Sequence, residues 1–172
     1  LGRVQGIEAL LNVISEIQNQ DFEFLFIGKG ALDSYVKRYI QDNELVHVKK
    51  IGWLPRIAQN EFLAQSTIGV ISLKAGMYGL GVPSKLYNLL AAGKPIFYIG
   101  DKNSEVHLIM QEHEIGWFAE ANNIEMIKNT FLEIINCDQS IITEYSINSR
   151  KLSEKLYSKK IILNKINKLF IS

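Results

Sequence analysis

Five short apolar runs alternate with longer helical stretches along this chain, and this alternation constrains the fold more than any other feature. The runs cover residues 22–27, 46–51, 67–73, 95–99 and 115–119. In the stretches between them, apolar residues recur at helical spacing. Buried strands that alternate with helices are typical of a parallel sheet with helices on both faces. We therefore predict an α/β fold, a Rossmann-like three-layer α/β/α domain with a parallel sheet.

The same pattern places the helices. It predicts them at residues 5–18, 32–41, 55–64, 84–92, 103–111 and 123–135. Residues from about 140 to 172 are rich in lysine and are predicted to form one or two further helices. Their apolar stripe consists of Ile162, Ile166, Leu169 and Phe170. The length of 172 residues suits one compact domain, and no repeat or low-complexity linker divides it.

Composition excludes several functional classes. The formal charge is +1, and no long basic run precedes the C-terminal end, so nucleic acid is not expected as a partner. The single Cys137 excludes an intramolecular disulfide and lacks zinc-type spacing, which favours a cytoplasmic protein without a metal. No apolar run approaches the roughly 20 residues of a transmembrane helix. The chain does not begin with Met, and we expect it to be a fragment of a longer protein.

Residues 79–95 are the most informative segment for function. A loop with Gly79 and Gly81 leads through Pro83 into a helix for which Ser84 is a suitable N-cap. A phosphate at this helix start would meet free backbone N–H groups and the ammonium group of Lys85. Asn88 lies three residues further on the same helix face, where its side chain could hydrogen-bond a sugar hydroxyl. A capped helix with a solvated Lys and Asn is the alternative, and spacing alone does not decide between the two.

Two further loops follow predicted strands and should lie at the same sheet edge, because right-handed crossovers bring all strand carboxyl ends together. Gly28 and Gly30 resemble the start of a dinucleotide fingerprint, but Asp33 stands where a third glycine would be. We favour a tight strand-to-helix turn there over a loop that contacts a base or ribose. Trp53, in the second loop, is a candidate wall of a base pocket, although packing is the commoner role.

The remaining polar residues give weaker signals. Arg3 is a candidate ligand of a pyrophosphate, although an arginine near a terminus is usually solvated. The histidines do not cluster, so a metal site is not expected. No arrangement of Ser, His and Asp or of Cys and His is recognisable, and no residue is assigned as catalytic. The chain therefore has the features of a binding half without reacting groups.

The segment 79–95 closely resembles the donor-binding domain of retaining glycosyltransferases of family 4, which have the GT-B fold. The shared pattern is a strand, a Gly-x-Gly-x-Pro-Ser-Lys loop, and a helix that runs into Ala-Ala-Gly-Lys-Pro. Residues 2–11, 26–30 and 51–55 match further segments of the family. The resemblance extends to about Leu163, and its Pro-Ser-Lys pattern is similar to the bacterial branch that builds capsule and lipopolysaccharide O-antigen.

The resemblance implies that a nucleotide-diphosphate sugar, with UDP as the expected nucleotide, lies across the sheet edge as a substrate rather than a cofactor. Arg3 and Lys85 would face the diphosphate, and the amides of residues 79–84 would hold phosphate or sugar. The turn at Gly28 and the loop with Trp53 and Leu54 would flank the nucleoside. Many relatives carry Glu at the position of Asn88, where it accepts hydrogen bonds from the ribose. They also carry an acidic residue where residues 74–76 are Lys-Ala-Gly.

The resemblance also implies that the N-terminal acceptor domain is absent, and that this chain is the C-terminal half of a GT-B enzyme. The whole enzyme would transfer a hexose or an N-acetyl sugar to a glycan or lipid-linked acceptor, whereas the chain alone would bind donor without turnover. We expect a cytoplasmic enzyme with peripheral contact at the inner face of the cell membrane. Lys151, Lys155, Lys159 and Lys160 are candidates for such contact, although a solvated helix surface is the simpler interpretation.

Two other functions remain open at this point. One is a nicotinamide- or flavin-binding Rossmann domain of an oxidoreductase. The missing third glycine counts against it, as does the lack of an acidic residue about 20 positions further on. The other is a non-catalytic flavodoxin-like module, for which an acidic cluster at the end of the first strand would be expected.

Overall fold

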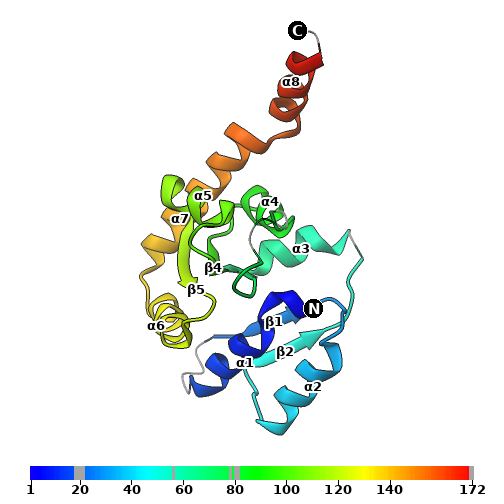
Figure 1. The fold of residues 1–172 in the computed structure, drawn as a ribbon, viewed down its shortest axis with the longest axis vertical. Coiled ribbons are helices and arrows are strands. Elements are labelled where there is room, and N and C mark those ends of the chain that lie inside the picture. The colour runs from blue at the N-terminus through cyan, green and yellow to red at the C-terminus, as the bar shows by residue number, and fades with distance from the viewer. Residues whose placement is uncertain (18–21, 56, 78, 80–81, 171–172) are drawn as a thin grey trace.

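The computed structural model describes residues 1–17, 22–55, 57–77, 79 and 82–170. Parallel strands alternate with helices in it, which confirms the predicted α/β class (Figure 1). The strands are β1 (Phe24–Ile27), β2 (Val48–Ile51), β3 (Gly69–Ser72), β4 (Ile96–Gly100) and β5 (Gly116–Glu120). The helices are η1 (Arg3–Gln5), α1 (Ile7–Glu16), α2 (Asp33–Asp42), α3 (Ala58–Gln65), α4 (Lys85–Ala91), α5 (Glu105–His113), α6 (Ile124–Ile135), α7 (Gln139–Leu152), the π-helix η2 (Ser153–Tyr157) and α8 (Lys159–Phe170).

Several elements begin later than the apolar pattern predicts, and each delay has a local cause. A 3₁₀ turn ends at Gly6 in the left-handed conformation, so α1 begins after it. Glu44 has a positive φ of 50°, which keeps the chain in a turn before β2. At α3, the Ala58 N–H donates to the Pro55 carbonyl (2.9 Å) in a turn that precedes the helix.

The strands form two sheets rather than the single sheet that was predicted. β1 pairs with β2, and β3, β4 and β5 form the second sheet, with every pair parallel. Among the described residues no strand joins β1 to β3. Apolar patterning predicts which segments are strands, whereas their lateral pairing depends on which edges come together in three dimensions. The predicted parallel α/β fold is confirmed, and in the described chain its strands are divided between two sheets.

Helices cover both faces of the strands, so the three-layer architecture is confirmed. On one face α1 and α6 pack over both sheets, with Leu11, Ile14 and Ile127 fully buried against strand residues that include Phe97. On the other face α4, α5 and α7 cover the three-stranded sheet around the buried Tyr98. All five residues of β4 are buried, as is typical of a central parallel strand.

The C-terminal segment forms helices, as predicted. α7 runs into the π-helix η2, and α8 then projects from the body (Figure 1). Ile162 and Ile166 of the predicted stripe are exposed, whereas the side chains of Leu169 and Phe170 lie outside the described residues. No described helix combines the length and the apolar character that crossing a lipid bilayer requires.

Candidate functional site

The first residues of the chain connect the ends of three strands. The Leu1 ammonium group donates to the Lys29 carbonyl (2.9 Å), and the Leu32 N–H donates back to the Leu1 carbonyl (3.2 Å). After β3, the Lys74 N–H donates to the Val4 carbonyl (2.8 Å). The Gly28 N–H, after β1, donates to the Ile51 carbonyl at the end of β2 (3.2 Å). The loops at the carboxyl ends of β1, β2 and β3 therefore lie at one edge, as the topology predicted.

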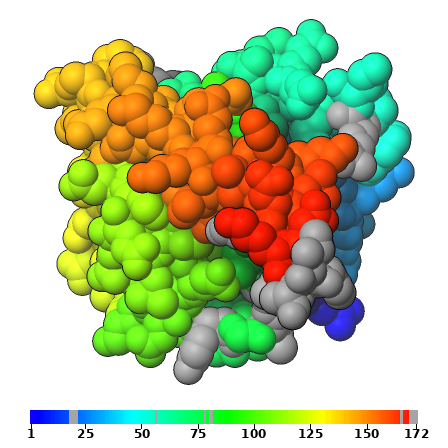
Figure 2. Space-filling view, turned by 90° about the horizontal axis from the view of Figure 1, so that it is seen from above, coloured from blue at the N-terminus to red at the C-terminus, as the bar shows by residue number. Residues whose placement is uncertain are grey.

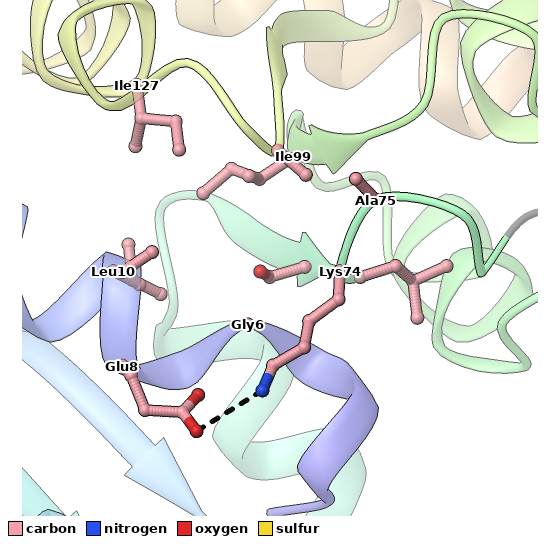
Figure 3. Close-up of a pocket in the computed structure, with 11 residues that line it drawn as sticks. Gly6, Glu8, Leu10, Lys74, Ala75, Ile99 and Ile127 are labelled. Carbon is pink, nitrogen blue, oxygen red and sulfur yellow. Dashed lines mark hydrogen bonds and ion pairs between the residues drawn. The ribbon is translucent and has the colours of Figure 1, made fainter.

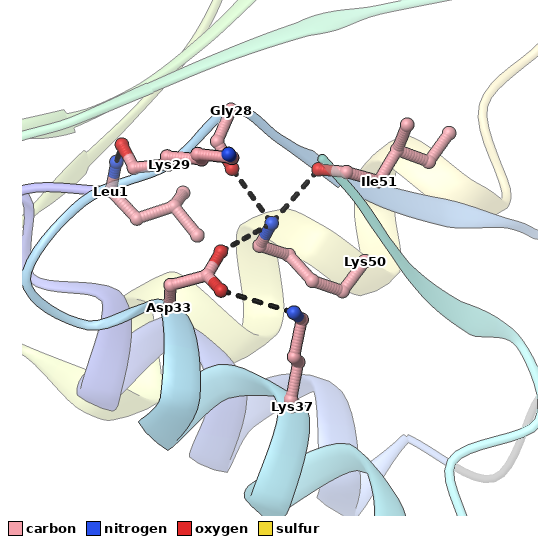
Figure 4. A network of polar contacts seen from close by, with 7 residues as sticks. All are labelled: Leu1, Gly28, Lys29, Asp33, Lys37, Lys50 and Ile51. Carbon is pink, nitrogen blue, oxygen red and sulfur yellow. Dashed lines mark hydrogen bonds and ion pairs between the residues drawn. The ribbon is translucent and has the colours of Figure 1, made fainter. Parts of the chain in front are cut away.

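The buried side chain of Lys50 connects the loops that follow β1 and β2 (Figure 4). The Lys50 side chain is only 3% exposed, and its ammonium group donates to the carbonyls of Gly28 (2.7 Å) and Ile51 (2.8 Å). It also pairs with the Asp33 carboxylate at 2.6 Å, and Lys37 reaches the same carboxylate at 3.2 Å. Contact with these ammonium groups, Lys50 first, lowers the pKa of Asp33 below its ordinary value.

This network explains the incomplete glycine fingerprint. Gly28 has a φ of +108°, which favours glycine, and a β-carbon on Gly30 would lie 2.2 Å from the Leu1 carbonyl oxygen. Asp33, in the place of a third glycine, holds Lys50 under the turn. The structure therefore confirms a tight turn at Gly28 and Gly30. Their contact with a nucleoside remains a prediction.

The helix after the glycine loop differs from its prediction at one residue. Ser84 occupies the N-cap position of α4, as predicted, but it has helical backbone angles and its side chain accepts no capping hydrogen bond. The Leu86 N–H instead donates to the Pro83 carbonyl (2.9 Å), so a turn at Pro83 starts the segment. α4 is only seven residues long, and we therefore place less weight on its dipole. Its buried face is as predicted, while Asn88 is exposed.

Lys85 has the electrostatic character of an anion ligand. Its side chain reaches solvent, yet surrounding protein atoms partly desolvate the ammonium group, and this desolvation lowers its pKa. No described carboxylate forms an ion pair with it. Burial lowers the pKa of the Leu1 ammonium group, and the charges of Lys85 and Lys50 lower it further. Lys85 and Lys50 therefore both lie near Leu1 at this edge.

The structure also places the other predicted residues. Arg3 begins η1 and is exposed near the Leu1 end of the site. Trp53 is 67% exposed and does not pack in a core of the described chain, and Leu54 beside it is half-buried. Gly79 is exposed with a φ of +86°, a conformation that favours glycine. Gly81 lies outside the described residues, so its predicted contact stays a prediction.

A separate cavity of about 270 Å³ opens beside this edge (Figure 3). Residues of α1, α6 and the ends of β3 and β4 line it, and none of the predicted site residues does. Lys74 and Glu8 form an ion pair of 3.3 Å at its wall. Glu8 Oε2 and Ser72 Oγ are buried there without a hydrogen-bond partner among the described residues. Lys74 therefore faces a neighbouring carboxylate, although the loop itself lacks the expected acidic residue.

Comparison with known proteins identifies the family. The model for "Glycosyl transferases group 1" matches residues 1–154. This chain belongs to that family. It is 35% identical over 165 residues to the probable glycosyltransferase WbjE of Pseudomonas aeruginosa, covering 96% of the chain and 40% of WbjE. It is 24% identical over 124 residues to the amylovoran biosynthesis glycosyltransferase AmsK of Erwinia amylovora, covering 70% of the chain and 30% of AmsK.

Solved structures share the fold of this chain. The structure of Anabaena Alr3699/HepE with UDP and glucose superimposes with a TM-score of 0.77 at 15% identity, covering 99% of this chain and 46% of HepE. At that identity the likeness concerns the fold alone, which is that of GT-B neighbours. The group 1 glycosyltransferase chain spans less than half the length of these relatives.

Two features of this group 1 glycosyltransferase chain were missed from sequence. Lys50 follows Val48 by two residues in a strand, so strict alternation would have turned it toward the same buried face. The spacing of Asp33 and Lys37, four residues apart on a helix, would have suggested a charged pair. No local pattern signals the pairing of Glu8 with Lys74, which are 66 residues apart.

Proposed function

We propose that this chain is the donor-binding part of a retaining family 4 glycosyltransferase and binds a UDP-linked sugar at the edge formed by the loops after β1, β2 and β3. One observation carries the proposal: Lys85 is a partly desolvated cation without a described anionic partner, near Leu1, whose backbone is hydrogen-bonded to the turn that follows Gly28. A diphosphate would supply the missing negative charge. Family membership and the UDP-bound HepE structure of the same fold support this choice of ligand.

The residue roles follow from position along the edge. Arg3 and Lys85 would contact the diphosphate, and the loop of Gly79, Gly81, Pro83 and Ser84 would hold phosphate or sugar. Gly28, Gly30, Trp53 and Leu54 would flank the nucleoside, with the exposed indole of Trp53 available to stack on the base. Asn88 would accept a hydrogen bond from the ribose through its carbonyl oxygen, without the charge of a carboxylate.

The chemical contribution of this half would be stabilisation of the departing diphosphate. Negative charge grows on the leaving phosphate oxygens as the bond to the sugar breaks, and fixed cations lower the energy of that state. Lys85 is suited to this because its ammonium group is already partly desolvated. An N-terminal domain of the longer protein would bind the acceptor. We therefore expect the chain alone to bind the donor sugar nucleotide without transferring the sugar.

For the whole enzyme we propose transfer of a hexose or N-acetyl sugar, with retention, to a glycan or lipid-linked acceptor in capsule or O-antigen synthesis. The name of AmsK, an amylovoran biosynthesis glycosyltransferase, supports a polysaccharide product. We place the enzyme in the cytoplasm, with peripheral contact at the inner face of the membrane, where lipid-linked acceptors would be reached.

Calorimetry with UDP, GDP, UDP-glucose, UDP-N-acetylglucosamine and NAD tests the proposed ligand. We expect UDP and at least one UDP-sugar to bind more tightly than NAD. Tighter binding of NAD would instead favour the oxidoreductase alternative. Binding of none of these nucleotides to a folded chain, verified by circular dichroism, would overturn the proposal and favour a non-catalytic module.

A further inference from the structure

The side chain of Asp101 connects the segments that follow two neighbouring strands. Asp101 comes directly after β4, and its carboxylate oxygen Oδ2 accepts a hydrogen bond from the Gly76 N–H at 2.8 Å. Gly76 lies 25 residues earlier, in the segment after β3. A hydrogen bond to a carboxylate is about twice as strong as one between neutral groups. Asp101 can therefore hold the start of the segment that leads to α4.

This segment begins with a turn that has one definite peptide orientation. The Met77 N–H donates to the Lys74 carbonyl (3.3 Å), which closes a turn over residues 74–77. Gly76, at the third position, has a φ of +78°, whereas Ala75 does not have a positive φ. This combination is that of a type II turn. Type I and type II turns differ by a rotation of roughly 180° of their central peptide, which here joins Ala75 to Gly76.

Asp101 contacts this central peptide. The Gly76 N–H belongs to it, and the hydrogen bond that closes the turn does not use this N–H. In the type I orientation the N–H would point away from Asp101, and the Ala75 carbonyl would face the carboxylate instead. Carbonyl and carboxylate oxygens only accept hydrogen bonds, so this arrangement would be repulsive. The carboxylate of Asp101 therefore favours the type II orientation.

The backbone of Asp101 belongs to a fixed part of the fold. All five residues of β4, immediately before it, are buried. The Ser104 N–H donates to the Asp101 carbonyl (3.1 Å), and Ser104 itself is only 5% exposed. The Ser104 hydroxyl caps α5 by accepting from the His107 N–H (3.2 Å). A short turn between a buried strand and a capped helix therefore carries the carboxylate.

Apolar packing does not fix the turn after β3. Residues 74–76 are exposed in the described chain and belong to neither hydrophobic core. Figure 2 shows atoms from this green part of the chain at the surface of the molecule. Lys74 bonds through its N–H to the Val4 carbonyl (2.8 Å) and through its side chain to Glu8 (3.3 Å), as Figure 3 shows for the ion pair. These contacts hold the first residue of the turn, whereas the Asp101 carboxylate holds its central peptide.

We propose that Asp101 is a positioning residue for the segment between β3 and α4, to which the proposed function assigns the diphosphate and the sugar. By selecting the type II orientation, it sets the direction in which the chain leaves β3 toward Gly79 and Lys85. Groups that are oriented before a ligand arrives bind it more tightly, because no binding energy is lost in ordering them. The inference rests on the proposed function for its ligand, whereas the orientation of the turn is independent of any ligand.

Amide hydrogen exchange, measured by NMR, tests the turn without a ligand. In Asp101→Ala the Gly76 N–H loses its acceptor and should exchange about tenfold faster or more. Asp101→Asn retains an oxygen that accepts, so exchange at Gly76 should stay within about threefold of that in the unmodified chain. Glu105→Ala is the matched control, since it removes an exposed carboxylate that forms no ion pair in the described chain. Unchanged exchange in Asp101→Ala, or equal acceleration in the control, would overturn the proposal.

Calorimetry tests the link to the ligand. Asp101→Ala should weaken UDP binding by about threefold to tenfold and leave uridine binding unchanged, because the proposed uridine contacts lie on the loops after β1 and β2. Asp101→Asn should restore UDP binding to within about twofold of the unmodified chain. A purely structural role would instead lower the urea concentration at which the chain unfolds and weaken uridine binding equally. That result would contradict a positioning role.

A change at Gly76 tests the same orientation independently. A β-carbon there would have no atom within 4 Å, so Gly76→Ala acts through backbone conformation and not through a clash. Alanine disfavours a φ of +78°, and this change should therefore weaken UDP binding as Asp101→Ala does. The double variant should bind UDP no more weakly than Gly76→Ala alone, because both changes remove the same orientation. Additive losses would show that Asp101 does not act through Gly76.

The two kinds of measurement separate this inference from the proposed function. If neither UDP nor a UDP-sugar binds the unmodified chain, the proposed function is wrong and the role of Asp101 in donor binding is wrong with it. Exchange at Gly76 then still decides whether Asp101 orients the turn. If UDP binds, and Asp101→Ala binds it as tightly as the unmodified chain, the proposed function stands and the positioning role is wrong.

Discussion

The three-stranded sheet and the two-stranded sheet are built from similar strands but differ in how they are stabilised. β4 has neighbours on both sides, is covered on both faces, and has all five residues buried. β1 and β2 have one strand neighbour each, and among their described residues only Phe26 and Val48 are buried hydrophobics. The smaller sheet depends instead on α1 and α2 and on polar contacts at its carboxyl edge.

This difference matters because the proposed nucleoside loops follow the smaller sheet. An isolated pair of strands is marginally stable, and packing or local polar contacts must hold its loops in place. Lys50 and Asp33 supply such contacts directly below the Gly28 turn. We infer that the three-stranded sheet determines the global stability of the chain. The Lys50 network instead determines the geometry of the loops that are proposed to flank the nucleoside.

The largest expected effect comes from matched aromatic changes in the two sheets. Phe97 and Phe24 lie at similar centroid distances from Phe131, 6.2 and 6.1 Å, but Phe97 is 1% exposed while Phe24 is half-buried. Phe97→Ala should lower the free energy of unfolding by about 3–5 kcal/mol because it opens a cavity in the core. Phe24→Ala should cost less than half of that. Equal losses in urea unfolding would contradict the proposed difference between the sheets.

Removal of the buried charge should have an intermediate effect. Lys50→Met leaves the Gly28 and Ile51 carbonyls without their donor and should lower the free energy of unfolding by about 1–3 kcal/mol. Lys49→Met is the control on the same strand, since its side chain is 58% exposed and its ion pair with Glu23 lies at the surface. The control should cost at most about 0.5 kcal/mol. If the two variants unfold at the same urea concentration, Lys50 does not stabilise the turn.

A lysine next to the three-stranded sheet sharpens the comparison. Lys94 donates to the carbonyls of Ser66 (2.6 Å) and Ala64 (3.1 Å) at the end of α3, next to the three-stranded sheet. Lys94→Met should cost about 0.5–1.5 kcal/mol. Hydrogen exchange should accelerate at the end of α3 and remain unchanged in β1. Faster exchange in β1 instead would show that the two regions are not independent.

The smallest expected effect is a dependence on pH confined to the two-stranded sheet. Because Asp33 has a lowered pKa in the folded state, its contribution is present above the unfolded value of 3.8 and is lost as pH falls through the lower folded value. Stability should therefore decline in this acidic range more steeply in the unmodified chain than in Asp33→Asn. Thermal unfolding of both proteins from pH 6 to pH 3 measures the difference. Parallel curves would exclude Asp33 as a contributor.

The sequence predicted the helices and strands better than it predicted which strands pair with one another. Every predicted strand and helix exists, because apolar spacing reports which face of a segment is buried. The separation of the sheets could not be predicted, since it depends on which backbone edges meet. Ser84 lies at the predicted N-cap position but makes no capping hydrogen bond, because the turn at Pro83 already brings it into helical geometry.

The candidate site was predicted in outline. The loops that carry Gly28 and Lys85 lie at one edge because parallel topology requires it. Lys50 was overlooked because two of its three acceptors, on Gly28 and Asp33, lie on other segments of the chain. The cavity beside Glu8 combines segments far apart in sequence, and no local pattern could have indicated it.

Binding of UDP and of uridine to the unmodified chain and to Lys85→Ala tests the central claim most directly. If Lys85 contacts the diphosphate, calorimetry should show UDP binding weakened by about tenfold or more, while uridine binding is unchanged. Lys29→Ala, an exposed lysine of the neighbouring turn, is the control and should bind UDP nearly as tightly as the unmodified chain. Equal weakening of UDP and uridine by Lys85→Ala, or unchanged UDP binding, would contradict the account.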